Sequence, residues 1–195
     1  MAIFLDPDLS RKTTNVNEAF DAKTATYPLP SLVEISVSGT CNRTCAFCPH
    51  GDPNYPDIKE FIDNALVNKM SLELADMGFK GVILFSGFGE PLLDKKIFDH
   101  IATVKKNLPE ARTELITNGD PLNRKRLDKL FAAGLDTLLI SVYDGPKEEE
   151  DFHTFCKEAG LSEDQYVIRP RYLPPEEDFG ITLTNRGGMM ENAEH

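Results

Sequence analysis

The chain has 195 residues, a length that suits one compact domain with a buried core. Asp and Glu outnumber Lys and Arg by 32 to 21, which gives a formal net charge of −11, and no basic run interrupts this excess. A surface of this charge repels phosphate backbones and anionic lipids, so we expect no nucleic acid and no membrane among the partners of the protein.

The first 30 residues are polar and show no hydrophobic periodicity, so we expect residues 1–30 to form an extended N-terminal arm. Asp6 and Asp8 interrupt the apolar run that a secretory signal needs, and no later segment has 18 consecutive apolar residues. We therefore expect a cytoplasmic protein. In a reducing compartment its four cysteines serve as ligands, catalytic groups or buried apolar residues more often than as disulfides.

Five segments have the composition of strands that are buried on both faces. Their centres are mostly continuous apolar runs, the pattern of parallel strands covered by other elements on each side. These segments are 31–39, 81–87, 112–119, 136–145 and 166–173. A further segment at 180–184 is expected to supply a sixth strand.

Helical patterns separate these strands. Apolar residues recur at helical spacing over 58–77 and over 94–108. A third helix is expected to have Asp120 as its N-cap and to end before Gly134, and a fourth is expected at 147–159. Alternating strands and helices predict right-handed βαβ units, arranged either as an open doubly wound sheet or as a partial barrel.

Three cysteines, Cys41, Cys45 and Cys48, follow the first strand within eight positions. One interpretation is a structural zinc site with His50 or Cys156 as its fourth ligand. The other is a [4Fe-4S] cluster, which needs four ligands, so that a loop with three cysteines leaves one iron open. Cys156 falls on the apolar stripe of the fourth predicted helix, which favours a place in the core over a ligand role.

The spacing of the three cysteines resembles the CxxxCxxC signature of the radical S-adenosylmethionine (radical SAM) enzymes, and Phe47 supplies the aromatic residue before the last cysteine. The segment FSGFGEPLL at 85–93 resembles the GGEP-like motif of the family, with Phe88 inserted between the two glycines. A glycine-rich turn at the end of a strand exposes backbone carbonyls to a ligand. Glu90 in this turn offers an acceptor for an ammonium group.

The resemblance covers roughly residues 31–185 and implies an α/β fold, a single-domain parallel partial (βα)6 barrel of TIM type. Residues 186–195 form a C-terminal tail, which ends before the auxiliary-cluster extension of the SPASM and twitch relatives, so we expect one [4Fe-4S] cluster in this chain. The resemblance implies cluster ligands Cys41, Cys45 and Cys48, and S-adenosylmethionine-binding residues Phe47, Gly87, Phe88, Gly89, Glu90 and Ser141. Asn118 ends the third strand, where it either joins this ligand site or caps the turn. Arg171 shares one face of the fifth strand with Arg169, and that face is either the barrel interior, where Arg171 would hold the S-adenosylmethionine carboxylate, or solvent.

The family resemblance also implies a reaction. An electron from the reduced cluster cleaves S-adenosylmethionine to methionine and a 5′-deoxyadenosyl radical, which abstracts hydrogen from a small metabolite, a sugar or a peptide. A flavodoxin or ferredoxin would donate the electron, oxygen would destroy activity, and an oxidoreductase or epimerase outcome is favoured. The alternatives are an activating enzyme for a glycyl-radical enzyme and a noncatalytic zinc or iron–sulfur module. The sequence identifies no catalytic residue for the substrate radical.

Overall fold

The computed structural model describes residues 7–20, 28–56 and 58–173 of the chain. These residues contain five parallel strands in one sheet, in the order β1-β2-β3-β4-β5. All five predicted strands are confirmed, and the sixth, expected at 180–184, lies outside the described residues. The strands are β1 (Leu32–Ser36), β2 (Val82–Ser86), β3 (Arg112–Thr117), β4 (Thr137–Val142) and β5 (Tyr166–Pro170).

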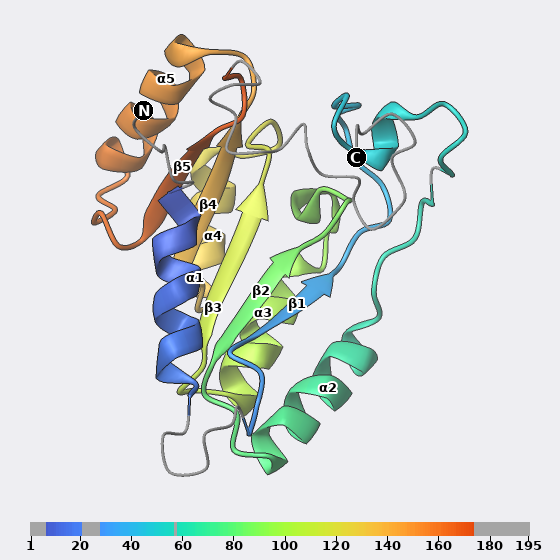
Figure 1. Ribbon diagram of the computed structural model, residues 1–195, viewed down its shortest axis with the longest axis vertical. Coiled ribbons are helices and arrows are strands. Elements are labelled where there is room, and N and C mark those ends of the chain that lie inside the picture. The colour runs from blue at the N-terminus through green and yellow to red at the C-terminus, as the bar shows by residue number, and fades with distance from the viewer. Residues whose placement is uncertain (1–6, 21–27, 57, 174–195) are drawn as a thin grey trace.

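A helix connects each strand to the next one along the sheet. The strand order never reverses, so right-handed crossovers bring these helices to the same face. A doubly wound sheet has a point of reversal and helices on both faces, and the predicted partial barrel of α/β type is therefore confirmed. The connecting helices are α2 (Asn64–Asp76), α3 (Ile97–Asn107), α4 (Arg124–Ala132) and α5 (Pro146–Glu158). In Figure 1, α3 and α4 are seen behind the strands and α2 lies beside the β1 edge.

The main core fills the space between the sheet and these helices. Alternate strand residues point into it, and Ile83, Phe85 and Leu115 are completely buried there. Cys156 on α5 belongs to the same core, which confirms its predicted place. Burial raises the pKa of its thiol to about 11. Among residues 7–20, 28–56 and 58–173, no helix has both the length and the apolar composition that crossing a bilayer requires.

The prediction of an extended N-terminal arm is wrong for residues 7–18, which form helix α1 (Pro7–Glu18). This helix lies in front of the sheet in Figure 1, on the face opposite α3 and α4, and it contacts β5. Arg11 of α1 forms an ion pair with Glu114, a buried carboxylate of β3. The polar sequence of α1 gives little local signal, and contacts with distant strands hold the helix in place.

Replacing Arg11 with glutamine is expected to loosen α1. The partly buried ion pair with Glu114 contributes about 1 kcal/mol, so amide hydrogen exchange over 7–18 should accelerate severalfold. The matched control is Arg124→Gln, which removes an exposed ion pair with Asp128 on α4. This variant should change the free energy of unfolding by less than about 0.5 kcal/mol. Unchanged exchange in α1 of the Arg11 variant would show that other contacts hold this helix.

Two predicted helix boundaries also need correction. Helix α2 begins at Asn64, because Asp63 caps it by accepting a 3.1 Å hydrogen bond from the Ala65 amide. The preceding Phe61 instead forms an antiparallel bridge with Ser38. The apolar periodicity over 58–77 therefore spans two different structures, the bridge at Phe61 and helix α2.

The predicted N-cap of the third helix is wrong. Asn123 caps α4 and accepts a 3.0 Å hydrogen bond from the Arg126 amide. Asp120 instead binds side chains of the cysteine loop, and Gly134 follows the end of the helix with φ +101°, as predicted.

Candidate active site at the carboxyl ends of the strands

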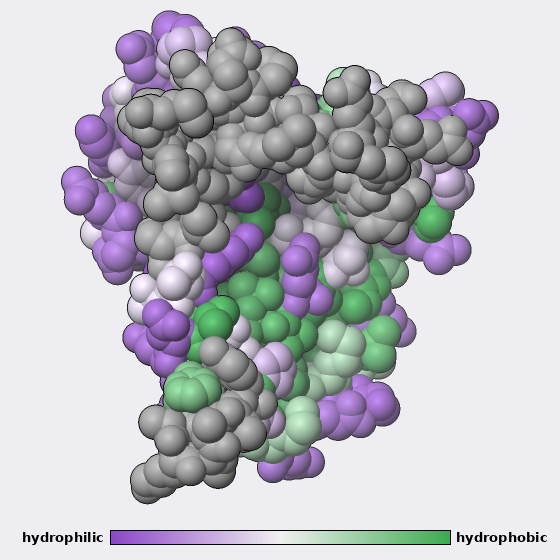
Figure 2. Space-filling model, in the orientation of Figure 1, coloured by the Kyte–Doolittle hydropathy of each residue, from purple (hydrophilic) through white to green (hydrophobic). Residues whose placement is uncertain are grey.

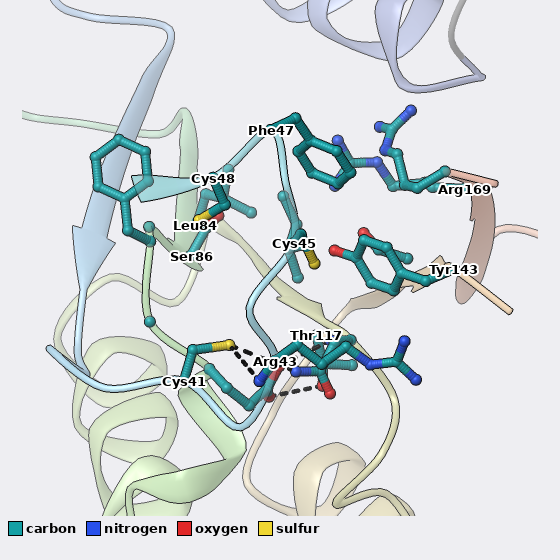
Figure 3. Close-up of a pocket in the computed structure, with 18 of the residues that line it drawn as sticks. Cys41, Arg43, Cys45, Phe47, Cys48, Leu84, Ser86, Thr117, Tyr143 and Arg169 are labelled. Carbon is teal, nitrogen blue, oxygen red and sulfur yellow. Dashed lines mark hydrogen bonds between the residues drawn. The ribbon is translucent and has the colours of Figure 1, made fainter. Parts of the chain in front are cut away.

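All the predicted site residues line one cavity of about 600 Å³. The cavity opens at the carboxyl ends of the strands, where ligands of parallel α/β proteins bind. Figure 3 shows the cysteine loop on one side of the cavity and Tyr143 and Arg169 on the other. The predicted residues that line it are Cys41, Cys45, Phe47, Cys48, Gly87, Phe88, Gly89, Glu90, Asn118, Ser141 and Arg171.

The cysteine loop is folded by short-range backbone hydrogen bonds. The Cys48 amide donates to the Cys45 carbonyl at 2.9 Å, and the Gly51 amide donates to the Cys48 carbonyl at 2.8 Å. Pro49 then begins the 3-10 helix η1 (Pro49–Gly51), where a proline costs no hydrogen bond. These turns curl the loop so that all three cysteines border the cavity.

The thiols lie in an environment that suits a cationic metal centre. Burial raises the pKa of Cys41. Burial, and to a lesser extent repulsion from the Cys48 and Cys41 thiolates, raises the pKa of Cys45 to about 11. A bound metal reverses this effect because coordinating thiols lose their protons. The Cys41 sulfur also accepts hydrogen bonds from the Arg43 amide at 3.5 Å and from the Asn118 side chain at 3.7 Å (Figure 3).

The donor set fits an iron–sulfur cluster. Iron–sulfur clusters are held by cysteine thiolates, and three half-buried thiols border one cavity here. In the described part of the chain, no three His, Cys, Asp or Glu side chains are grouped so as to hold a single metal ion. A cubane is larger than one ion, so its thiolates stand farther apart. Of the two candidate fourth ligands for zinc, Cys156 lies in the core.

The glycine turn after β2 fits tightly against the end of β1 and the residues that lead from it to the cysteine loop. Gly87 has φ +117°, and a Cβ there would lie 2.4 Å from the Ser36 hydroxyl oxygen. A Cβ on Gly89 would lie 1.9 Å from the Ser38 carbonyl oxygen. Only glycine allows this approach, which supports the backbone role that the sequence predicts for the turn.

Replacing Gly89 with alanine is expected to destabilise the fold by about 2 kcal/mol or more, because backbone atoms must move to admit the methyl group. Urea unfolding measures this cost. The control is Gly160→Ala, where φ is +81° but nothing lies within 4 Å of the new Cβ, so only backbone strain of about 1 kcal/mol is added. Equal losses in both variants would contradict the tight fit.

Glu90 has a structural role that sequence reasoning missed. Its side chain is buried and accepts hydrogen bonds from the backbone amide of Leu92 at 2.9 Å, the Thr117 hydroxyl at 2.7 Å and the backbone amide of Asn118 at 2.8 Å. Burial raises the pKa of Glu90, and the three donors oppose this rise. The carboxylate thereby fixes the turn after β2 to the end of β3.

A second buried network supports the same turn. Asp94 follows the 3-10 helix η2 (Pro91–Leu93), and its side chain lies 2.9 Å from the Nε2 atom of His100, which is fully buried on α3. The Nδ1 atom of His100 lies 2.8 Å from the side-chain oxygen of Asn64 at the start of α2. The segment after the glycine turn is thus fixed to both helices behind it.

The ends of β4 and β5 supply the opposite wall of the cavity. Tyr143 stacks on Phe47 of the cysteine loop, with ring centroids 6.0 Å apart and planes 15° apart. Burial and the Cys45 thiolate raise the pKa of Tyr143 to about 12. Arg169 and Arg171 share one face of the strand, as their spacing predicts, and both border the cavity, which decides between the two alternatives in favour of the barrel interior.

Sequence reasoning missed three charged residues in this cavity: Lys12 of α1, Glu34 of β1 and Arg43 of the cysteine loop. Glu34 gave a usable signal, since it is a charge within an otherwise apolar strand. Lys12 gave none, because its helix was not predicted. Arg43 lies between Cys41 and Cys45, and its guanidinium contacts Asp120 and Asp144, which are distant in the sequence.

A parallel partial barrel with a three-cysteine loop at the carboxyl ends of its strands defines a class of cofactor-dependent enzymes. The family model of the radical SAM superfamily matches residues 35–168. The chain belongs to the radical SAM superfamily.

Two curated relatives lie in the same superfamily. The chain is 32% identical over 162 residues to S-adenosyl-L-methionine-dependent 2-deoxy-scyllo-inosamine dehydrogenase of Niallia circulans, an alignment that covers 83% of this chain and 61% of that protein. It is 34% identical over 110 residues to GTP 3′,8-cyclase of Chlorobaculum tepidum, covering 56% of this chain and 32% of that one. The chain thus spans less than two thirds of these relatives.

A solved structure is similar to this chain over most of its length. BtrN in complex with AdoMet and 2-DOIA superposes with a TM-score of 0.69 at 29% identity, over 85% of this chain and 64% of that chain. This chain therefore has the same fold as a protein whose structure was solved with S-adenosylmethionine bound.

Proposed function

We propose that this chain is a radical SAM oxidoreductase that oxidises an alcohol carbon of a small hydroxylated molecule. The observation that carries the proposal is the trio of thiols on one wall of a cavity whose other walls are the glycine turn and the ends of β3, β4 and β5. The outcome of the reaction is supported by the likeness to a 2-deoxy-scyllo-inosamine dehydrogenase over 83% of this chain.

Cys41, Cys45 and Cys48 would hold a [4Fe-4S] cluster in this cavity. When bound, this group supplies the low-potential electron that cleaves S-adenosylmethionine to methionine and a 5′-deoxyadenosyl radical. The Asn118 side chain orients the Cys41 thiol by donating to its sulfur. Leu84 of β2 and Ile116 of β3 add apolar side chains to the lining of the cavity.

The remaining residues would bind S-adenosylmethionine. Gly87 and Gly89 keep side chains away from its methionine part, and Phe88 lies in the same turn. The Glu90 carboxylate accepts three hydrogen bonds from the protein. A carboxylate can accept about four, so one position is left for an ammonium group.

The other walls of the cavity carry three further roles in the proposal. Phe47 would contact the adenine, Ser141 the ribose or the carboxylate, and Arg171 the carboxylate. A flavodoxin or ferredoxin is the proposed electron donor.

Anaerobic reconstitution tests this proposal. The chain should bind about four irons and, with dithionite and S-adenosylmethionine, release 5′-deoxyadenosine. With 2-deoxy-scyllo-inosamine carrying deuterium at its alcohol carbons as the probe, deuterium should enter 5′-deoxyadenosine. Cleavage of S-adenosylmethionine with no hydrogen taken from this probe or from peptides would favour the activating-enzyme alternative, and a colourless chain with one zinc would support the noncatalytic module.

A further inference from the structure

Arg43 lies between Cys41 and Cys45, yet its side chain extends away from the Cys41 sulfur (Figure 3). Its guanidinium forms a two-pronged contact with Asp120 after β3, with Nε–Oδ2 at 2.8 Å and Nη2–Oδ1 at 2.6 Å. A second two-pronged contact reaches Asp144 after β4, with Nη1–Oδ1 at 3.0 Å and Nη2–Oδ2 at 2.9 Å. One side chain thus connects the cysteine loop to two strand ends.

A third carboxylate fixes the geometry of this contact. Glu148 near the start of α5 lies 3.5 Å from the Arg43 guanidinium. Its other oxygen accepts hydrogen bonds from the backbone amides of Tyr143 and Asp144, at 2.9 and 2.8 Å. The turn that carries Asp144 is therefore held in place independently of Arg43.

Aromatic and amide contacts extend the attachment along the loop. The Arg43 guanidinium lies over the ring of Tyr143, 4.9 Å from its centroid, and Tyr143 stacks on Phe47. Asn42 donates to Asp120 at 2.7 Å and accepts from Asn118 at 2.8 Å. The loop is thus attached on both sides of Cys45.

We infer that Arg43 is a positioning residue that holds the cysteine loop in its cluster-binding position before any cluster is present. Ordering a loop costs about 1–2 kcal/mol of backbone entropy per residue, and a loop ordered in advance spares this cost when the cluster is assembled. An arginine is required because its planar fork contacts two carboxylates at once, whereas lysine offers a single point charge. The role in cluster assembly rests on the proposed function, but the effect on the loop does not.

Hydrogen exchange on the metal-free chain tests the effect on the loop. Arg43→Gln should raise the exchange of residues 41–52 about tenfold, and Arg43→Lys should restore little of the protection. Asp144→Asn should raise it less, and Arg124→Gln should leave it unchanged. The inference is overturned if the amides of residues 41–52 exchange at the wild-type rate in Arg43→Gln. It is also overturned if amide exchange in β3 accelerates equally, which would mean general destabilisation.

The reconstituted chain provides a second readout, which a purely structural role would not move. Arg43→Gln and Asp144→Asn should both retain less iron, but they should shift the reduction potential in opposite directions because one removes a positive and the other a negative charge. Shifts of the same sign would contradict the inference that the charges of Arg43 and Asp144 are held close to the cluster. If the wild-type chain holds no cluster, the proposed function fails, while the exchange experiment on the metal-free chain still decides the role of Arg43.

Discussion

Replacing Cys45 with alanine is expected to abolish release of 5′-deoxyadenosine, with a rate at least about a thousandfold below that of the wild type. Cys45 is the central thiol of the loop, and it borders the cavity between Cys41 and Cys48. Two thiols cannot hold a cluster that needs three protein ligands, so iron should fall to a small residue after gel filtration. Anaerobic iron analysis and chromatography of the nucleoside products measure both effects.

The control for this experiment is Cys156→Ala, which removes the fourth cysteine of the chain. This thiol is completely buried in the core on α5, so its loss should cost about 1 kcal/mol of stability and leave iron content and product unchanged. Equal iron in the Cys45 and wild-type chains would contradict the ligand assignment. Loss of iron in the Cys156 variant would contradict the three-ligand assignment, and loss of a single zinc from it would support the zinc alternative with Cys156 as a ligand.

Replacing Glu90 with alanine is expected to destabilise the folded chain by about 4 kcal/mol, since the change leaves three buried donors without acceptors and opens a cavity. Glu90→Gln keeps one acceptor oxygen and should cost about 2 kcal/mol. Urea unfolding measures both values. Glu73→Gln, which changes an exposed carboxylate on α2, should lie within about 0.5 kcal/mol of the wild type.

Glu90 also predicts a pH dependence with a definite sign. Its folded-state pKa is raised by burial above the ordinary value of 4.5, so the folded chain binds this proton more tightly than the unfolded chain does. The contribution of Glu90 to the free energy of unfolding is therefore largest at low pH and is lost as pH rises through the folded-state pKa. The difference between the wild type and Glu90→Gln isolates this slope, and a difference that grows with pH would contradict it.

The strands and the cavity residues could be predicted because their signals are local. Most of the strands have continuous apolar runs at their centres, and polar residues of the site follow where these runs end. The strand order then places those ends side by side, so residues as far apart as Cys41 and Arg171 border one cavity.

The features that could not be predicted depend on distant partners. Helix α1 has a polar sequence and is held by the contact of Arg11 with Glu114, 103 residues away. Asp120 has the right residue type for an N-cap, but Arg43 and Asn42 bind its carboxylate, and Asn123 caps the helix instead. Local propensity was outweighed in both cases by contacts that only the fold creates.

The proposed chemistry requires the protein to donate three thiolates and to leave one iron of the cluster for S-adenosylmethionine. Electron–nuclear double resonance on the reduced, reconstituted chain tests it directly, with S-adenosylmethionine labelled by ¹⁵N in its amino group and by ¹⁷O in its carboxylate. We expect hyperfine coupling of the cluster to both labels. Absence of coupling to either label, together with coupling to a histidine nitrogen of the chain, would show that the protein itself occupies the fourth position and would contradict the claim.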